Sequence, residues 1–202
     1  MLAPRWLALG NPANYYLLLG AVLLAVSAAV PFWTGQRTAR IEARAHTVVQ
    51  ALAQAMFDLP GPLGEADRGL LLARFHAYAA RDGAFVADLE EHEPLPGTLL
   101  TLVGKHYVYH VAESPPEVPA TQTDLVPAYE VAAWPLAPYG PAHAVYFQPD
   151  DGLRAYTRNL AAGYHGLGDQ RVLPGRSQVR GNGLRLADRA YRSRDDERWL
   201  LY

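Results

Sequence analysis

The hydrophobic pattern of the chain begins with one long apolar segment that leads directly into an amphipathic one. Residues Tyr15–Trp33 contain no charged side chain. An α-helix rises about 1.5 Å per residue, so about 20 such residues cross the hydrocarbon core of a bilayer. We therefore predict a short N-terminal flank at residues 1–13 and a membrane-spanning helix at residues 14–34. The residues that mark this span are Tyr15, Leu24, Pro31 and Trp33.

Residues 35–58 continue the helix, but their large apolar side chains recur on one side only. Together with Ala45 they follow spacings of four, three and one, which are typical of a helix that packs on a globular body. The predicted packing face consists of Ile41, Val48, Val49, Leu52 and Met56. Arg44 falls on the opposite side of the helix and is expected to face solvent.

Two other interpretations of the N-terminal segment stay open: a signal peptide cleaved near Ser27–Ala29, and a buried core helix of a soluble protein. The length of the apolar run and its direct continuation as a helix favour an uncleaved single-pass anchor. The positive-inside rule bears on its orientation. Three arginines follow the span within eleven residues, whereas Arg5 is the only one before it, so the rule places the body of the protein in the cytoplasm.

The remaining residues, 59–202, predict a globular α+β head. A Pro- and Gly-rich break precedes a second helix at Glu65–Ala80, and Phe85–Glu93 is expected to add a further helical turn. Antiparallel strands are predicted at Thr98–Val103, His106–Val111, Tyr129–Trp134, Ala144–Phe147 and Leu153–Thr157.

Two details of this sheet follow from the first strand pair. Gly104-Lys105 suits a type II′ hairpin turn with glycine at its first position. In the next strand Tyr107, Tyr109 and Val111 alternate with histidines, which predicts one buried face. The fold class predicted is therefore a long membrane-spanning helix that continues into an amphipathic helix packed on a small antiparallel sheet.

The composition narrows the candidate chemistry. The net charge is −2 and the basic residues are dispersed, so no nucleic-acid partner is expected. The chain has no cysteine, and no catalytic or cofactor-binding motif stands out, so we predict no catalytic, cofactor or metal site and no enzyme activity. Glu90–Glu93 is interpreted as a solvated helix end. His106 and His110 would lie about 13 Å apart along a strand, too far to share one metal ion.

The order of parts resembles type IV pilins and the pseudopilins of type II secretion. The resemblance rests on LLLGAVLLAVSAAVPFW followed by QRTARIEARAHTVVQALAQA, and on the sheet that comes after them. Pro31 matches the family's helix-kinking proline and Ile41–Ala55 the helix that packs on the head. A weaker similarity to the heads of pilin-like proteins lies in YEVAAWP, YG, VYF and DG. The chain departs from the family at the processing signal, because Asn11 follows Gly10 and no glutamate precedes Glu42.

The resemblance implies a membrane-anchored, non-enzymatic structural or assembly subunit with an extracytoplasmic head. Its expected partners are the lipid bilayer and other pilin-like subunits or copies of itself. The region Tyr156–Tyr191, rich in arginine and tyrosine, is the predicted contact surface. The alternatives are a single-pass anchored sensory or ligand-binding domain, and an anchored enzyme of another class.

Overall fold

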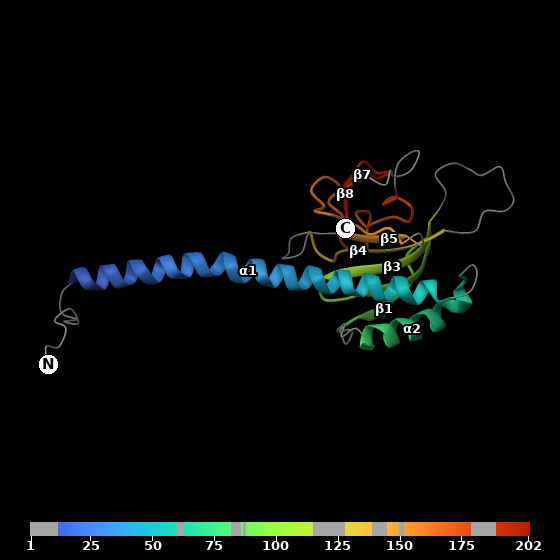
Figure 1. Ribbon diagram of the computed structural model, residues 1–202, viewed down its shortest axis with the longest axis horizontal. Coiled ribbons are helices and arrows are strands. Elements are labelled where there is room, and N and C mark those ends of the chain that lie inside the picture. Colours follow the sequence, from blue (N-terminus) through green and yellow to red (C-terminus); the bar gives the residue numbers. More distant parts are fainter. Residues whose placement is uncertain are drawn as a thin grey trace.

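The N-terminal helix is one continuous rod. In the computed structural model, which describes residues 12–59, 63–81, 86, 88–114, 128–138, 145–149, 152–178 and 189–202, helix α1 extends over Pro12–Phe57. Its 46 residues correspond to a length of about 69 Å. Figure 1 shows its first half projecting away from the head and its second half lying along the sheet. The helix continues through Pro31, the position matched to a kinking proline.

The serine and threonine hydroxyl groups of the projecting half bond to the helix itself. Ser27 Oγ donates to the carbonyl oxygen of Leu23 at 2.6 Å, and Thr34 Oγ1 lies 3.0 Å from the carbonyl oxygens of Val30 and Pro31. A hydroxyl that bonds to its own helix needs no water. These residues are therefore compatible with an apolar environment.

The second helix is shorter than predicted and begins with a different turn. Glu65–Asp67 form a 3₁₀ turn, η2, and α2 follows over Arg68–Arg81. The Gly64 N–H donates to Asp67 Oδ2 at 2.9 Å, which places a carboxylate at the start of this helical segment. Leu71, Phe75 and Ala79 recur at intervals of four and are buried, and α2 packs beside α1.

Within the described residues, eight strands form one antiparallel sheet in the order β1-β2-β3-β4-β5-β6-β8-β7. Their bounds are β1 Glu90–His92, β2 Thr98–Val103, β3 Tyr107–Ser114, β4 Ala128–Pro135, β5 Val145–Pro149, β6 Ala155–Thr157, β7 Ala190–Arg192 and β8 Arg198–Leu201. The helical turn expected at Phe85–Glu93 is wrong where the structure describes it, since β1 occupies part of that range. Its backbone pairs with Thr101–Val103 of β2, so tertiary pairing decides its conformation.

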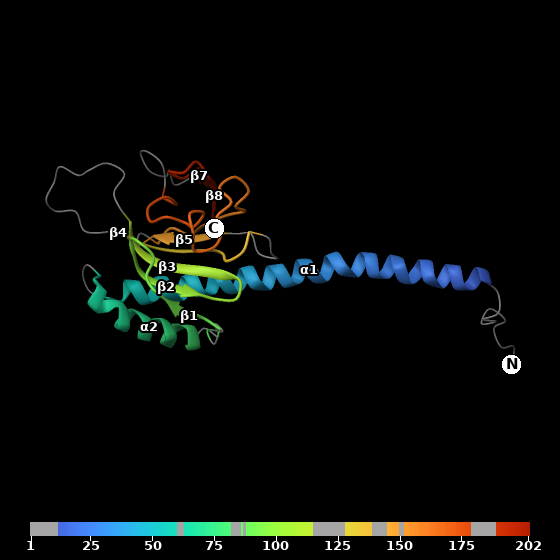
Figure 2. The same cartoon turned by 180° about the vertical axis from the view of Figure 1, so that it is seen from behind.

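The sheet is buried on both faces, whereas the alternation of residues around Tyr109 predicted only one buried face. Helices α1 and α2 cover the face that carries Leu100, Leu102, Tyr109 and Val131. The other face carries Trp134 and lies under the C-terminal segment, including Trp199. In Figures 1 and 2 the helices lie on one side of β3–β5 and the orange and red C-terminal segments on the other. His110 is therefore buried with this second layer.

The hairpin between β2 and β3 differs by one residue from the prediction. The Gly104 N–H donates to the Tyr107 carbonyl at 2.8 Å, so Lys105 and His106 form the tip of the turn. Gly104 does not have a positive φ. It is small for another reason: a Cβ there would lie 2.8 Å from Leu89 Cδ2. The fold class itself, a long N-terminal apolar helix and a second helix with α1 packed against an antiparallel sheet, is confirmed.

Candidate functional site

The first half of α1 presents an apolar surface to its surroundings. Leu24 is 74% exposed and Trp33 70% exposed, and Tyr15 and Pro31 are exposed as well. The most apolar 18-residue window of this helix has no buried residue. Leaving this surface in water is unfavourable at about 25 cal/mol per Å² of apolar area. Within the described ranges, α1 is the one helix that is long and apolar enough to cross a membrane.

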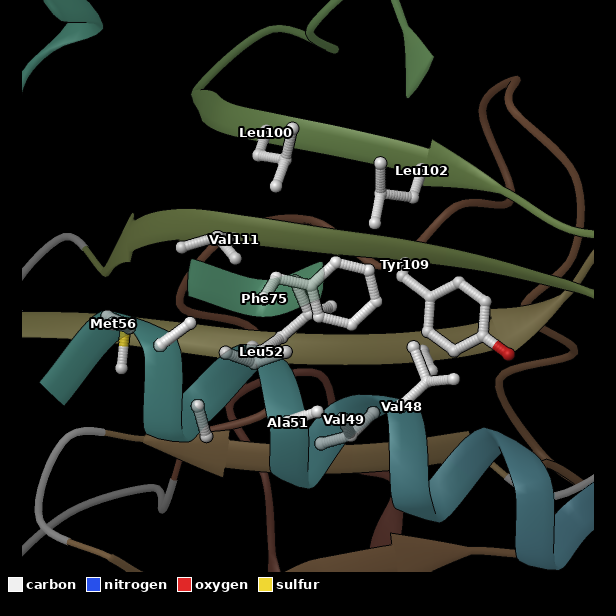
Figure 3. Close-up of a cluster of buried hydrophobic side chains, with 14 of the residues drawn as sticks. Val48, Val49, Ala51, Leu52, Met56, Phe75, Leu100, Leu102, Tyr109 and Val111 are labelled. Carbon is white, nitrogen blue, oxygen red and sulfur yellow. The ribbon is translucent and has the colours of Figure 1, made fainter. Parts of the chain in front are cut away.

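The second half of the same helix is part of the core. Val48, Val49, Leu52 and Met56 are buried, and Ile41 is partly buried at the edge of the cluster. Figure 3 shows Leu52 enclosed between α1, the Phe75 ring of α2 and the strands above. One rigid helix thus joins an exposed apolar surface to the head.

A pocket lies at the border between these two halves. It is about 410 Å³ in volume and is formed by α1, the segment before β1 and the tip of the β2–β3 hairpin. We call it the basic pocket. Its lining residues are Trp33, Gln36, Arg37, Arg40, Ile41, Arg44, Asp88, Leu89, Gly104, Lys105, His106, Tyr107 and Tyr109.

The basic pocket has an excess of positive charge. Four cationic side chains and one carboxylate line it, which leaves three formal positive charges while His106 is neutral. The carboxylate, Asp88, is bound by Arg44. In the described part of the chain, no carboxylate forms an ion pair with the other three cations, Arg37, Arg40 and Lys105. Arg44, predicted on the side of the helix opposite the packing face, is therefore part-buried and in contact with the head.

The pKa of His106 reflects its burial and the positive charges that surround the basic pocket. Burial lowers the pKa of its imidazole. The positive charges of nearby Lys105 and Arg37 lower this pKa further, because they repel the protonated ring. Arg44 acts in the same direction, and Asp88 opposes it. Residues from two separate elements therefore place their charges around one space.

The inner wall of the basic pocket is aromatic. Tyr107 is buried, and its hydroxyl has no hydrogen-bond partner among the described residues. Burial raises the pKa of this hydroxyl, so it is a neutral donor. In Figure 3 the Tyr109 hydroxyl points along α1 past Val48, toward the N-terminal side of the helix.

On another side of α1 an ion pair fixes the helix to the head. Arg158 Nη1 donates to Glu42 Oε1 at 2.8 Å and to Oε2 at 3.0 Å. Glu42 is shielded, with a side chain 12% exposed against 57% for Arg158. A charge-assisted pair to a shielded carboxylate holds its geometry better than an exposed one. Arg158, expected to belong to a dispersed surface, thus anchors the loop after β6 to α1.

The other histidine and acidic residues weighed in the sequence do not converge. Glu90, Glu91 and His92 are exposed on the edge strand β1, where Glu91 pairs with Arg68 at 2.6 Å. No group of three or more potential metal ligands occurs within the described segments. His106 lies at the hairpin tip and His110 lies inside the second layer.

A buried polar cluster around His110 was not anticipated from the sequence. His110 Nε2 lies 3.8 Å from Glu130 Oε1, and both side chains are fully shielded. Glu130 also accepts hydrogen bonds from Ser114 Oγ at 2.5 Å and from the Gly175 N–H at 2.8 Å. Burial lowers the pKa of His110 to about 3 and raises that of Glu130 to about 7. The cluster ties the C-terminal segment to the sheet.

The predicted contact surface at Tyr156–Tyr191 is partly interior. The Tyr191 ring stacks on Trp199 with centroids 6.4 Å apart, and its hydroxyl donates to the Ser177 carbonyl at 2.9 Å. Tyr164 is buried and bonds to Asp195. Arg180 and Arg185 lie outside the described residues. Two of the tyrosines expected at this surface are thus core residues.

Comparisons with known protein families, curated proteins and solved structures find no match for this chain. Its layout, a long N-terminal apolar helix followed by an antiparallel sheet, is compatible with that of a pilin-like protein. The basic pocket beside the exposed apolar helix is the candidate functional site.

Proposed function

We propose that this protein is a single-pass, membrane-anchored, non-enzymatic subunit of pilin-like layout that acts by association. One observation carries the proposal: a single helix has an exposed apolar first half and a core-forming second half. A membrane covers the first half most simply, because about 20 apolar residues match the hydrocarbon thickness. The proposal adopts the orientation that the resemblance to pilin-like proteins implies, with the head on the exported side.

Association through the first half of α1 follows from its exposed surface. Small residues, alanine and glycine among them, alternate with leucine and valine from Gly20 to Val30. Such surfaces allow helices to approach closely in lipid, where packing rather than hydrophobicity drives contact. Other copies, or related subunits, would meet there.

Three measurements test this function. The full chain should stay with membranes through carbonate and salt extraction, and N-terminal sequencing should find the apolar segment intact. A photoreactive amino acid at exposed Leu24 should then crosslink two copies in intact cells, whereas the same probe at buried Val48 should not. A mature protein that starts near Ala28 or Pro31 would identify a signal peptide and end the anchor. An intact anchored protein that crosslinks only to lipid would end the assembly role.

One observation favours a second candidate, an anchored ligand-binding domain. The basic pocket offers uncompensated positive charge and an aromatic wall in a space of ligand size. The same pocket is compatible with both functions, because an assembled subunit is also able to hold a ligand.

A further inference from the structure

The depth of the basic pocket relative to the membrane follows from its position on α1. Tryptophan prefers the membrane–water interface. Trp33 ends the apolar segment Tyr15–Trp33 and lines the pocket on the side of the projecting half of α1. Arg37 is four residues further on, or about 6 Å along the axis, and Arg40 about 10 Å. The headgroup layer is about 5–8 Å thick on each side of the hydrocarbon core. Arg37 therefore lies at headgroup depth, and Arg40 lies just beyond the headgroup layer, where its long side chain still reaches back toward it.

The side chains at this depth are those that bind phosphate. Guanidinium groups form paired, charge-assisted hydrogen bonds to phosphate oxygens, and an ammonium group supplies a compact charge. Arg37 and Arg40 come from α1, and Lys105 comes from the hairpin tip.

We propose that the basic pocket binds the phosphate of an anionic glycerophospholipid, clamped between α1 and the β2–β3 hairpin. This inference rests on the proposed membrane anchor and adds a ligand class to it. The lipid source is favoured over a free phosphate because Trp33 continues the wall toward the apolar surface of α1, where acyl chains lie. The excess of three positive charges selects against zwitterionic headgroups.

The test uses the full chain in detergent micelles with equal amounts of phosphatidylglycerol and phosphatidylcholine, followed by native mass spectrometry. Wild type should retain phosphatidylglycerol in preference to phosphatidylcholine. The double variant Arg37→Gln/Arg40→Gln should lose this preference by roughly tenfold or more, because it removes charge-assisted hydrogen bonds. Arg154→Gln/Arg198→Gln is the matched control, since it removes the same charge from exposed positions on the head. It should bind like wild type.

A second measurement follows His106 by NMR. A bound phosphate opposes the repulsion from Lys105, Arg37 and Arg44, so phosphatidylglycerol should raise the pKa of His106, whereas phosphatidylcholine should not. Tryptophan fluorescence confirms that each variant is folded, because Trp134 and Trp199 are fully buried.

Other outcomes overturn the inference in distinguishable ways. Equal lipid preference in wild type and in Arg37→Gln/Arg40→Gln refutes the pocket as the site. Displacement of the lipid by millimolar inorganic phosphate or glycerol phosphate refutes the lipid assignment in favour of a soluble anion. Carbonate extraction separates these from a failure of the anchor. A protein released by carbonate refutes the anchor, whereas a retained protein without lipid preference refutes only the headgroup site.

Discussion

Leucine-to-alanine substitutions at two positions of the same helix measure how α1 divides between membrane and head. Leu52 is 1% exposed in the core, and Leu24 is 74% exposed in the projecting half. Both changes remove the same three carbon atoms. Any difference in the free energy of unfolding of the head therefore comes from the surroundings of the side chain.

The expected cost of Leu52→Ala has two contributions. Loss of three buried carbon groups costs about 2.4 kcal/mol at about 0.8 kcal/mol each. An unrelaxed cavity adds up to about 2 kcal/mol at about 24 cal/mol per Å³. Because α1, α2 and the sheet all surround this side chain, we expect a total of about 3–4 kcal/mol. Leu24→Ala should change the stability of the head by less than about 0.5 kcal/mol.

The assay is urea unfolding of the full chain in detergent micelles, followed by tryptophan fluorescence. Trp134 and Trp199 lie in the second layer of the head and report its opening. Equal effects of the two substitutions, or a Leu52→Ala effect below about 1 kcal/mol, would refute the division of α1 into an exposed half and a core half.

Two further predictions concern the buried cluster and the orientation. Burial raises the pKa of Glu130 from about 4.5 to about 7, so the folded state holds a proton that the unfolded state releases in this window, and stability falls as pH rises through it. Wild type should lose up to about 3 kcal/mol of its free energy of unfolding between pH 4.5 and 7, and Glu130→Gln should not show this loss. Parallel pH profiles of the urea midpoints of the two proteins would contradict this expectation. His110 contributes to both proteins, so the difference between them isolates the carboxyl group. An alkaline phosphatase fused after Tyr202 should be active, because the proposed head is exported; a reporter active only in the cytoplasm would end that orientation.

Much of the fold was predictable because it depends on long or strongly patterned segments. The uncharged run at Tyr15–Trp33 and the stripe around Leu52 each involve many residues, so no single exception hides the period. The strands at Tyr107 and Tyr129 are rich in aromatic and β-branched residues, and their predicted bounds differ from the observed ones by three residues or fewer.

Short strands and the second layer were not predictable in the same way. Strand β7 has three residues and β8 has four, which is too few to establish an alternation. Strand β1 has no apolar side chain and forms because β2 offers a free backbone edge. The burial of His110 and Glu130 depends on Gly175 and its neighbours, a segment about 45 residues after Glu130 in the chain. No pattern in the sequence around His110 or Glu130 indicates that a later segment will bury them.

The candidate site shows the same limit. Arg37 and Arg40 are separated from Lys105 by more than sixty residues, and they meet only because the β2–β3 hairpin reaches back over α1. In the sequence these residues are isolated charges. A hairpin tip with adjacent basic residues, here Lys105 and His106, is the local signal that sequence reasoning left unused.

The arginines after the span have two physical explanations, and the structure separates them. As a count, Arg37, Arg40 and Arg44 favour a cytoplasmic head, because positive flanks are retained on that side. In the folded protein, however, Arg44 binds Asp88 and all three arginines line the basic pocket. A residue that has a role in the folded state is present whichever way the chain inserts. The arginine count is therefore a weaker guide to orientation here than in a protein whose flanking charges have no structural contacts, and the phosphatase fusion after Tyr202 decides between the two orientations.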